Sequence, residues 1–311
     1  MTAGRTLRLG TRGSALALAQ ARAVAEAIGA DVELVEVPTV GDDASTAVSA
    51  LGGTGVFVSA LRDRLLAGEI DLAVHSYKDL PTAPAAGLVV AAVPRREDPR
   101  DVLVARDGAT LGELRTGARV GTGAPRRIAQ LRSLGLGLEV VPIRGNVDTR
   151  LRKVAEGEFD AVVLARAGLA RLGRLAEVTE VLDPIQMLPA PAQGALAVEC
   201  RVDDVELTAL LAPLEDAGSR AAVTAERALL AALEAGCTAP VAALAEIAIG
   251  ESEQDTEMYL RGSVTALDGS DAARLSATGL IVEADAIGRR LAADLLDAGA
   301  KHLMGVTDER T

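Results

Sequence analysis

Residues 7–30 read LRLGTRGSALALAQARAVAEAIGA, and this stretch decides how the chain begins to fold. A short strand comes first, a glycine turn follows, and an Ala- and Leu-rich helix runs from about Ser14 to Ile28. Ser14 stands at the N-cap, where a side-chain oxygen can accept from the free backbone N–H groups of the first turn. Residues 32–39 then predict a second strand. A strand, a helix and a strand in this order indicate a parallel sheet.

The same alternation continues along the chain and then starts again. Up to residue 94 the pattern predicts a helix at 55–70 and strands at 71–77 and 87–94. A polar, proline-containing junction, RREDPRD, occupies residues 95–101. Beyond it the sequence predicts strands at 101–105, 118–123, 138–145 and 159–165 and helices at 125–135 and 147–157. We therefore expect an α/β protein with two doubly wound parallel units.

The last third of the sequence changes character. Residues 187–201 are expected to be irregular and then to form a strand that returns the chain to the first unit. A long helix from about Ser219 is expected to stop at Gly236 as its C-cap glycine. A strand at 257–267 and a helix near 286–299 complete a smaller α+β domain. The expected domains are 1–95 with 195–215, then 100–190, and finally 218–311.

The composition limits the classes of partner. The formal net charge of −12 argues against a general nucleic-acid or membrane-surface binder. Residues 95–174 nevertheless carry 16 basic and ten acidic side chains. Such a basic middle indicates either a local anion site or a solvated surface. The N-terminus has no apolar signal segment and no apolar run reaches the ~18 residues of a membrane helix, so we expect a soluble cytoplasmic protein.

Four polar clusters follow predicted strands, where ligands bind in open α/β sheets. They read GTRGS at 10–14, HSYKD at 75–79, GTGAPRR at 121–127 and IRGNVDTR at 143–150. Five arginines and one lysine outnumber the carboxylates of these clusters, which predicts a substrate with several negative charges. These charged residues are Arg12, Lys78, Asp79, Arg126, Arg127, Arg144 and Arg150.

Each cluster taken alone also has a purely structural interpretation. A glycine turn before a helix is usually structural, and Lys78 and Asp79 could be solvated turn residues. His75 at a strand end reads as a hydrogen-bonded core residue, and Phe57 and Met187 read as core residues. Neither histidine has a partner at metal-ligand spacing, so no metal site is expected.

The two cysteines have different surroundings in the sequence. Cys200 lies within the apolar strand ALAVECR and reads as a small buried residue. Cys237 follows Gly236 and precedes Thr238 and Pro240, on an expected loop. A loop cysteine is more often present for its reactivity than for packing.

Nine motifs in order resemble those of the porphobilinogen deaminase family, also called hydroxymethylbilane synthases, over nearly the whole chain. They are TRGSALALAQ, GVF, AVHSYKDLP, REDPRD, RGNVDTRL, FDAVVLARAGLARLG, LPAPAQGALAVECR, VTAERALLAALEAGC and LRGSV. The resemblance implies two periplasmic-binding-protein-like domains with a cleft between them, and a third domain that presents Cys237. It also implies a monomeric transferase of tetrapyrrole (haem) biosynthesis that acts on porphobilinogen, without nucleic acid or membrane partners.

The resemblance assigns Cys237 a thioether to a dipyrromethane cofactor, whose free pyrrole primes chain growth. Four porphobilinogen molecules are added with loss of ammonia, and hydrolysis then releases hydroxymethylbilane. Asp79 matches the catalytic aspartate, which would stabilise cationic pyrroles and relay protons. Arg12 and Lys78 belong to the same catalytic group.

Further positions match family residues that bind the cofactor or the substrate. The cofactor-binding positions are Ser14, Ser76, Lys78, Asp79, Thr122, Arg126, Arg127, Arg144 and Arg150. The substrate-binding positions are Arg12, Ser14, Phe57, Arg150 and Arg171. The sequence departs from the family pattern at Ala50 and Thr54, which replace loop lysines, and at Gly123 and Ala124, which replace serines. Backbone N–H groups at the following helix start could substitute for those two hydroxyls.

Two alternatives remain open on the sequence. A non-catalytic two-domain anion-binding protein would share the α/β pair and the arginines. It would need neither Cys237 nor Asp79, and it would usually carry an export signal. A family member that has lost its activity is the other alternative, and the presence of Cys237, Asp79 and the arginines argues against it.

Overall fold

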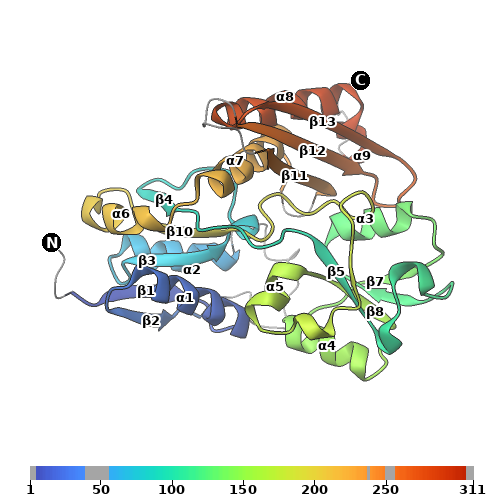
Figure 1. The fold of residues 1–311 in the computed structure, drawn as a ribbon, viewed down its shortest axis with the longest axis horizontal. Coiled ribbons are helices and arrows are strands. Elements are labelled where there is room, and N and C mark those ends of the chain that lie inside the picture. Colours follow the sequence, from blue (N-terminus) through green and yellow to red (C-terminus); the bar gives the residue numbers. More distant parts are fainter. Residues whose placement is uncertain (1–4, 39–55, 237–238, 249–255, 306–311) are drawn as a thin grey trace. The chain divides into compact units, whose positions relative to one another are not determined.

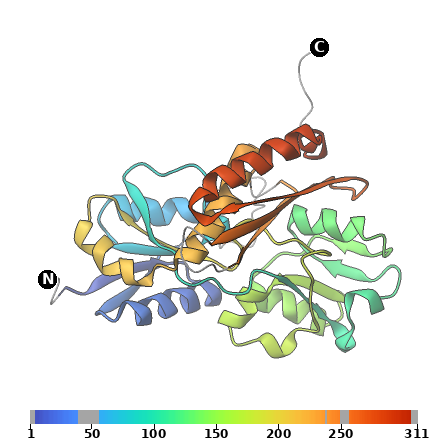
Figure 2. The same ribbon diagram turned by 45° about the horizontal axis from the view of Figure 1, so that its top comes forward.

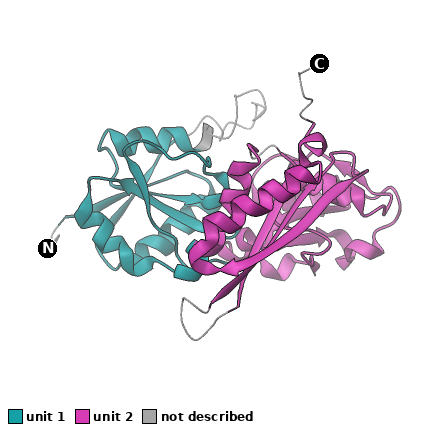
Figure 3. Ribbon diagram, turned by 90° about the horizontal axis from the view of Figure 1, so that it is seen from above, with its two compact units in different colours: residues 1–97, 194–220 teal, residues 98–193, 221–311 magenta. Residues whose placement is uncertain are grey.

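The structure is a computed structural model that describes residues 5–38, 56–236, 239–248 and 256–305, without the side chains of Val56 and Phe57. The chain forms two compact units, residues 1–97 with 194–220 and residues 98–193 with 221–311 (Figure 3). Among the helices in the described ranges, none has the length and apolarity that a bilayer crossing requires.

The first unit is built on a five-stranded sheet in the order β2-β1-β3-β10-β4 (Figure 1). Its strands are β1 (Leu7–Thr11), β2 (Val32–Glu36), β3 (Leu72–Ser76), β4 (Leu88–Ala92) and β10 (Leu196–Arg201). Its helices include α1 (Ala15–Ile28), α2 (Val56–Leu66) and α6 (Val205–Leu211). Residues of α1 pack with Leu72 and Val74 of β3, whereas Leu61 and Leu65 of α2 pack with Ala73. Because neighbouring strand residues point to opposite faces, α1 and α2 cover opposite sides of the sheet.

Helix α1 confirms the expectation from residues 7–30. The Oγ of Ser14 accepts from the backbone N–H of Ala17 at 3.3 Å, which caps the first turn. Gly29 ends the helix with φ 67°, in the left-handed region that glycine adopts without strain.

The second unit repeats the arrangement in a sheet of order β7-β6-β8-β5-β9. Its strands are β5 (Asp101–Ala105), β6 (Arg119–Gly121), β7 (Glu139–Val141), β8 (Ala161–Ala165) and β9 (Glu180–Val181). Its helices in this part are α3 (Pro125–Ser133), α4 (Val147–Ala155) and α5 (Arg166–Arg171). In the first unit β2, β1 and β3 are parallel, and β10 is antiparallel to both β3 and β4. In the second unit β7, β6 and β8 are parallel, and β5 is antiparallel to both β8 and β9.

The expectation of wholly parallel sheets is therefore wrong at β10 and β5. Strand β5 follows the 95–101 junction, and β10 follows the irregular segment from residue 187. Neither strand is reached from a sheet neighbour through a crossover helix, which is the connection that makes consecutive strands parallel. Both units are thus mixed α/β sheets.

The C-terminal part of the second unit is a three-stranded antiparallel sheet with helices on one face (Figure 2). It contains β11 (Val241–Ala248), β12 (Glu257–Thr265), β13 (Ala272–Leu280), α7 (Ala217–Ala232), α8 (Ala284–Asp297) and α9 (Ala300–Leu303). Leu229 of α7 and Leu291 of α8 share a core with Leu260 of β12. A Cβ at Gly288 would lie 2.2 Å from the carbonyl oxygen of Ala225, so only glycine lets α8 approach α7 this closely. The expected α+β domain is confirmed.

The expected end of the long helix is wrong. Helix α7 stops at Ala232, and the residue with positive φ is Glu234, at 51°. The N–H of Ala235 donates to the carbonyl of Leu230 at 3.2 Å, which closes the helix before Gly236 is reached.

Candidate functional site

Two of the predicted polar clusters meet in the first unit. Arg12, Ser76 and Asp79 line a cavity of about 40 Å³ together with Gln20 and His75. The clusters follow β1 and β3, which are parallel neighbours in the sheet. Their carboxyl ends lie at the same edge, so side chains more than 60 positions apart share one hollow.

A single 3-10 turn, Tyr77–Asp79, presents the predicted catalytic aspartate. The N–H of buried Tyr77 donates to the carbonyl of Ala195 at 3.0 Å, and the N–H of Leu80 donates to that of Tyr77 at 3.2 Å. Because Tyr77 and Leu80 are buried on either side, the backbone of the turn is fixed. Asp79 is exposed and Lys78 is half-buried, so both heads are accessible to a ligand.

Ser14 and Ser76 are brought to the same part of the first unit. The hydroxyl of Ser14 caps α1, and that of Ser76 accepts from the Nε2 of Gln20 at 3.1 Å. Gln20 is buried within α1 and did not emerge as a site residue from the sequence. Its position two turns into an apolar helix is the signal that could have identified it, since a buried amide needs a polar partner.

His75, which lines the cavity, belongs to a buried group of charged side chains. Its Nε2 is 3.3 Å from the Oε2 of Glu199 on β10. Arg62 of α2 reaches the same carboxylate with two nitrogens, Nη2 to Oε1 at 2.8 Å and Nε to Oε2 at 3.1 Å. Burial opposes ionisation of Glu199, but the nearby His75 and the hydrogen-bonded Arg62 outweigh it and lower its pKa. His75 is indeed buried, and its charged neighbour Glu199 comes from a strand far away in sequence.

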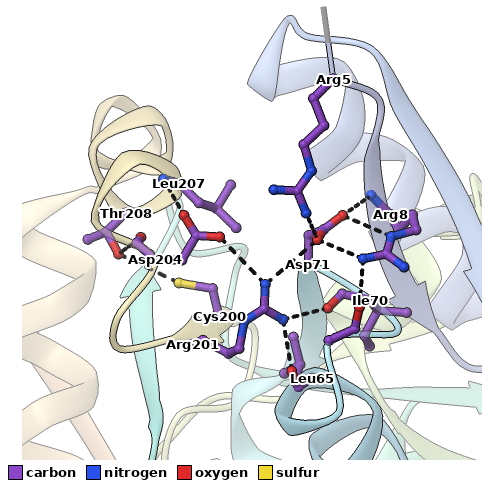
Figure 4. Close-up of polar contacts among 11 residues, drawn as sticks. Arg5, Arg8, Leu65, Ile70, Asp71, Cys200, Arg201, Asp204, Leu207 and Thr208 are labelled. Carbon is purple, nitrogen blue, oxygen red and sulfur yellow. Dashed lines mark hydrogen bonds and ion pairs between the residues drawn. The ribbon is translucent and has the colours of Figure 1, made fainter. Parts of the chain in front are cut away.

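A second buried carboxylate, Asp71, stands at the opposite edge of the same sheet (Figure 4). The backbone N–H of Arg8 donates to the Asp71 carboxylate at 2.8 Å, and the guanidinium of Arg8 lies 3.0 Å from the same carboxylate. Arg5 and Arg201 also form ion pairs with Asp71. Burial opposes ionisation of Asp71, yet the hydrogen bonds from Arg8 keep its pKa below the usual range. This group joins β1, β3 and β10 and is structural.

Cys200 confirms its interpretation as a core residue. It is fully buried, and its Sγ lies 3.7 Å from the Oγ1 of Thr208 (Figure 4). Burial raises the pKa of the thiol, which keeps it protonated and unreactive.

In the second unit the predicted arginine pair is buried around Asp101. Arg126 Nη1 and Arg127 Nη2 each lie 2.8 Å from one of its carboxylate oxygens, and the Nε2 of Gln193 donates to it at 2.8 Å. Arg126 also donates to the carbonyl of Leu188 at 2.6 Å. Burial lowers the pKa of Arg126 and disfavours the Asp101 charge, but the two guanidiniums hold the pKa of Asp101 far below its usual range. The pair is therefore oriented by a carboxylate that sequence reasoning missed.

Arg144 and Arg150 supply positive charge without a carboxylate partner within the described ranges. Arg144 is exposed in the loop before α4, and the Nε of Arg150 donates only to the carbonyl of Gly145 at 2.8 Å. Burial, together with the charge of Arg127, lowers the pKa of Arg150. An anion bound beside Arg150 would stabilise its charged form.

The loop before α3 lacks side-chain caps. The Oγ1 of buried Thr122 accepts from the N–H of Ala124 at 3.3 Å, and no side chain caps the helix at Ala124. The helix begins at Pro125, and the use of its first free N–H groups in place of the missing serine hydroxyls stays a prediction. Arg171 ends α5 and is half-buried. Cys237, Ala50, Thr54 and the side chain of Phe57 lie outside the described residues.

Asp101→Asn is expected to lower the free energy of unfolding by about 3–5 kcal/mol, because it leaves two buried guanidiniums uncompensated. The folded pKa lies below the unfolded value of about 3.9, so the stabilisation is present above roughly pH 4. It is lost as the pH falls below that value. Urea unfolding at several pH values measures both effects.

The matched control is Asp107→Asn, which removes a carboxylate that is 87% exposed in the same unit. It should change the free energy of unfolding by less than about 0.5 kcal/mol. Equal effects for the two variants would show that Asp101 is not the buried charge that orients the arginines.

Comparison with protein families gives two matches. Residues 7–209 match the model described as porphobilinogen deaminase, dipyromethane cofactor binding domain, and residues 220–297 match porphobilinogen deaminase, C-terminal domain. A porphobilinogen deaminase of Nocardia farcinica is 61% identical over 97% of this chain and 88% of its own length. One of Mycobacterium bovis is 59% identical over 96% of this chain and 98% of its own.

Solved structures give more distant similarities. The VFT2 domain of BvgS from Bordetella pertussis matches with a TM-score of 0.39 and 18% identity, over 67% of this chain and 85% of that domain. A methionine-binding protein matches with a TM-score of 0.40 and 14% identity, over 67% of this chain and 89% of its own.

Proposed function

The chain belongs to the porphobilinogen deaminase family, and from this premise we propose how its own residues act. It is a hydroxymethylbilane synthase, which condenses four porphobilinogen molecules with loss of ammonia in tetrapyrrole biosynthesis. The observation that carries this function is the 59–61% identity to such enzymes over nearly the full chain. The non-catalytic anion-binding alternative does not account for that identity.

The described residues fit a dipyrromethane cofactor. Each pyrrole ring carries an acetate and a propionate, so the cofactor is a polycarboxylate. Arg144 and Arg150 present guanidinium donors without a carboxylate partner in the described ranges, and guanidinium forks match carboxylates. When bound, the cofactor supplies the electron-rich free pyrrole on which the chain grows.

We propose that Cys237 holds this cofactor through a thioether and that the remaining positions bind its carboxylates or those of the substrate. The cofactor-binding set is Ser14, Ser76, Lys78, Asp79, Thr122, Arg126, Arg127, Arg144 and Arg150. The substrate-binding set is Arg12, Ser14, Phe57, Arg150 and Arg171. The arginines on Asp101 support this proposal, because their guanidiniums are already oriented before a ligand arrives.

Asp79 is proposed as the catalytic carboxylate, with Arg12 and Lys78 as its cationic neighbours. Its fixed turn holds a negative charge beside a cavity that Arg12 also lines. A carboxylate near a pyrrole N–H stabilises positive charge that develops on the ring and can accept or return the proton. Arg12 would hold a substrate carboxylate, which orients the ring toward Asp79.

The domain division 1–95 with 195–215, 100–190 and 218–311 also stays a proposal, in which the last domain presents Cys237. We further propose that the enzyme works as a monomer in the cytoplasm, with porphobilinogen as its small-molecule substrate and without nucleic acid, membrane or metal.

Intact-mass spectrometry of the purified protein tests the cofactor proposal directly. The expected mass exceeds that of the chain by two pyrrole units, and the same protein should convert porphobilinogen into hydroxymethylbilane. A bare chain mass with no turnover after incubation with porphobilinogen would favour a family member that has lost its activity.

A further inference from the structure

A second hollow, of about 410 Å³, lies in the second unit against the C-terminal sheet. Its volume falls in the range of about 300–1,000 Å³ that is typical of small-molecule sites. It is lined by β12, β13, the segment near Leu188 and Gln130 of α3. None of the site residues proposed above lines it.

The hollow lies on the face of the C-terminal sheet that α7 and α8 do not cover. Tyr259, Arg261 and Ser263 of β12 pair with Thr278, Ser276 and Arg274 of β13, and directly paired residues share a face. Met258 and Leu260, which alternate with Tyr259 and Arg261 along β12, point into the helix-covered core. Tyr259, Arg261 and Arg274 therefore stand on the other face, toward α3.

Two arginines of the hollow have guanidinium N–H groups that could donate to an anion. Arg261 donates from Nη2 to Glu246 at 2.6 Å, while its buried Nε has no acceptor within the described residues. Arg274 is exposed, and its only described contact is a 3.5 Å hydrogen bond to the Oγ of Ser133. Two guanidiniums thus accompany one described carboxylate, and a buried donor without an acceptor is costly unless a ligand satisfies it.

The other side chains of the hollow suit a flat apolar body. Tyr259 is 42% exposed, and the Cζ of Arg261 lies 5.9 Å from the centroid of its ring. Ile185 is 75% exposed at the same hollow, which Pro184 also lines. Aromatic and aliphatic surface beside a few polar donors is the usual composition of a small-molecule site. We propose that this hollow binds a small aromatic carboxylate.

The wall of the hollow is connected to the arginine pair of the first proposal. The side-chain amide of Gln130 forms two hydrogen bonds to the backbone of Leu188. It accepts from the Leu188 N–H at 2.8 Å and donates to the Leu188 carbonyl at 3.0 Å. That carbonyl also accepts from Arg126 at 2.6 Å. A ligand that displaces Leu188 lengthens this bond and misplaces Arg126, so kcat/KM for porphobilinogen falls. This second effect rests on the proposed role of Arg126, whereas binding does not.

Titration of the holoenzyme with phenylacetate, followed by ligand-observed NMR, tests the binding. We expect a Kd of roughly millimolar for so small a probe. Neutral phenylacetamide and inorganic phosphate should each bind more weakly, because one lacks the charge and the other the ring. Phosphate binding as tight as phenylacetate binding would overturn the aromatic assignment, and equal phenylacetamide binding would overturn the anionic one.

Arg261→Gln and Arg274→Gln should each weaken phenylacetate binding roughly tenfold. The matched control, Arg289→Gln, removes an exposed arginine of α8 that pairs with Asp285 outside the hollow, and should bind the probe normally. Unchanged affinity in both hollow variants would place the probe elsewhere and sink the proposal.

Turnover separates this site from the catalytic one. Phenylacetate at a concentration near its Kd should lower kcat/KM of the unaltered enzyme, whereas Arg274→Gln should keep its own activity and require a roughly tenfold higher concentration for the same inhibition. Equal sensitivity of Arg274→Gln and the unaltered enzyme would mean that the probe competes at the catalytic arginines. If the proposed function is wrong, the protein shows no turnover even without phenylacetate. The NMR titration would still test whether the hollow binds the probe.

Discussion

Serine at position 237 is expected to leave the protein without covalent cofactor and without measurable formation of hydroxymethylbilane. The hydroxyl is a much weaker nucleophile than a thiolate, so Cys237→Ser cannot form the thioether that tethers the primer. The mass of the purified variant should equal that of the bare chain. Turnover should fall to background, because every addition starts from the primer.

Cys200→Ser is the matched control. Cys200 is buried in β10 with its thiol protonated, so it has no route to the cofactor. This variant should keep the two-pyrrole mass and lose roughly 1–2 kcal/mol of stability, since a hydroxyl is buried in place of a thiol. The reverse pattern, with the adduct lost from Cys200→Ser and kept in Cys237→Ser, would reassign the tethering thiol.

Asp79→Asn is expected to slow turnover by about 10²–10³ while the fold and the cofactor are retained. The side chain is exposed at the end of a turn fixed by Tyr77 and Leu80, so the amide fits without repacking. It removes the negative charge and the proton acceptor but keeps the size. Single-turnover assays of a variant with verified cofactor mass measure the chemical step apart from cofactor loading.

An exposed aspartate of the same unit provides the comparison. Asp63→Asn changes the same charge on α2, outside the cavity, and should leave turnover within about twofold. If Asp79→Asn turned over at the rate of Asp63→Asn, Asp79 would have no catalytic role and its assignment would be withdrawn.

The local sequence was sufficient for most elements and for the cavity of the first unit. Helix α1 begins after Ser14 and ends before Gly29 because both caps act within one turn of the residues they terminate. Arg12 and Asp79 could be placed at one sheet edge because both follow strands of one α/β alternation. Local signals also misled, since Gly236 has the usual residue type of a C-cap but α7 closes earlier, at Glu234.

Long-range contacts decided the rest. The antiparallel direction of β5 and β10 depends on where the chain re-enters each sheet. Glu199, which lies beside His75, also binds Arg62 from a position 137 residues away. Asp101 reads as the first residue of an ordinary strand, and only packing makes it the buried charge between Arg126 and Arg127.

The sequence by itself determined the family, the α/β alternation and the residue types that the chemistry requires, because periodicity, caps and motifs are properties of neighbouring residues. The tertiary structure alone decided which charges are buried and paired. The energy of a buried ion depends on every group within a few ångströms, whatever its distance along the chain.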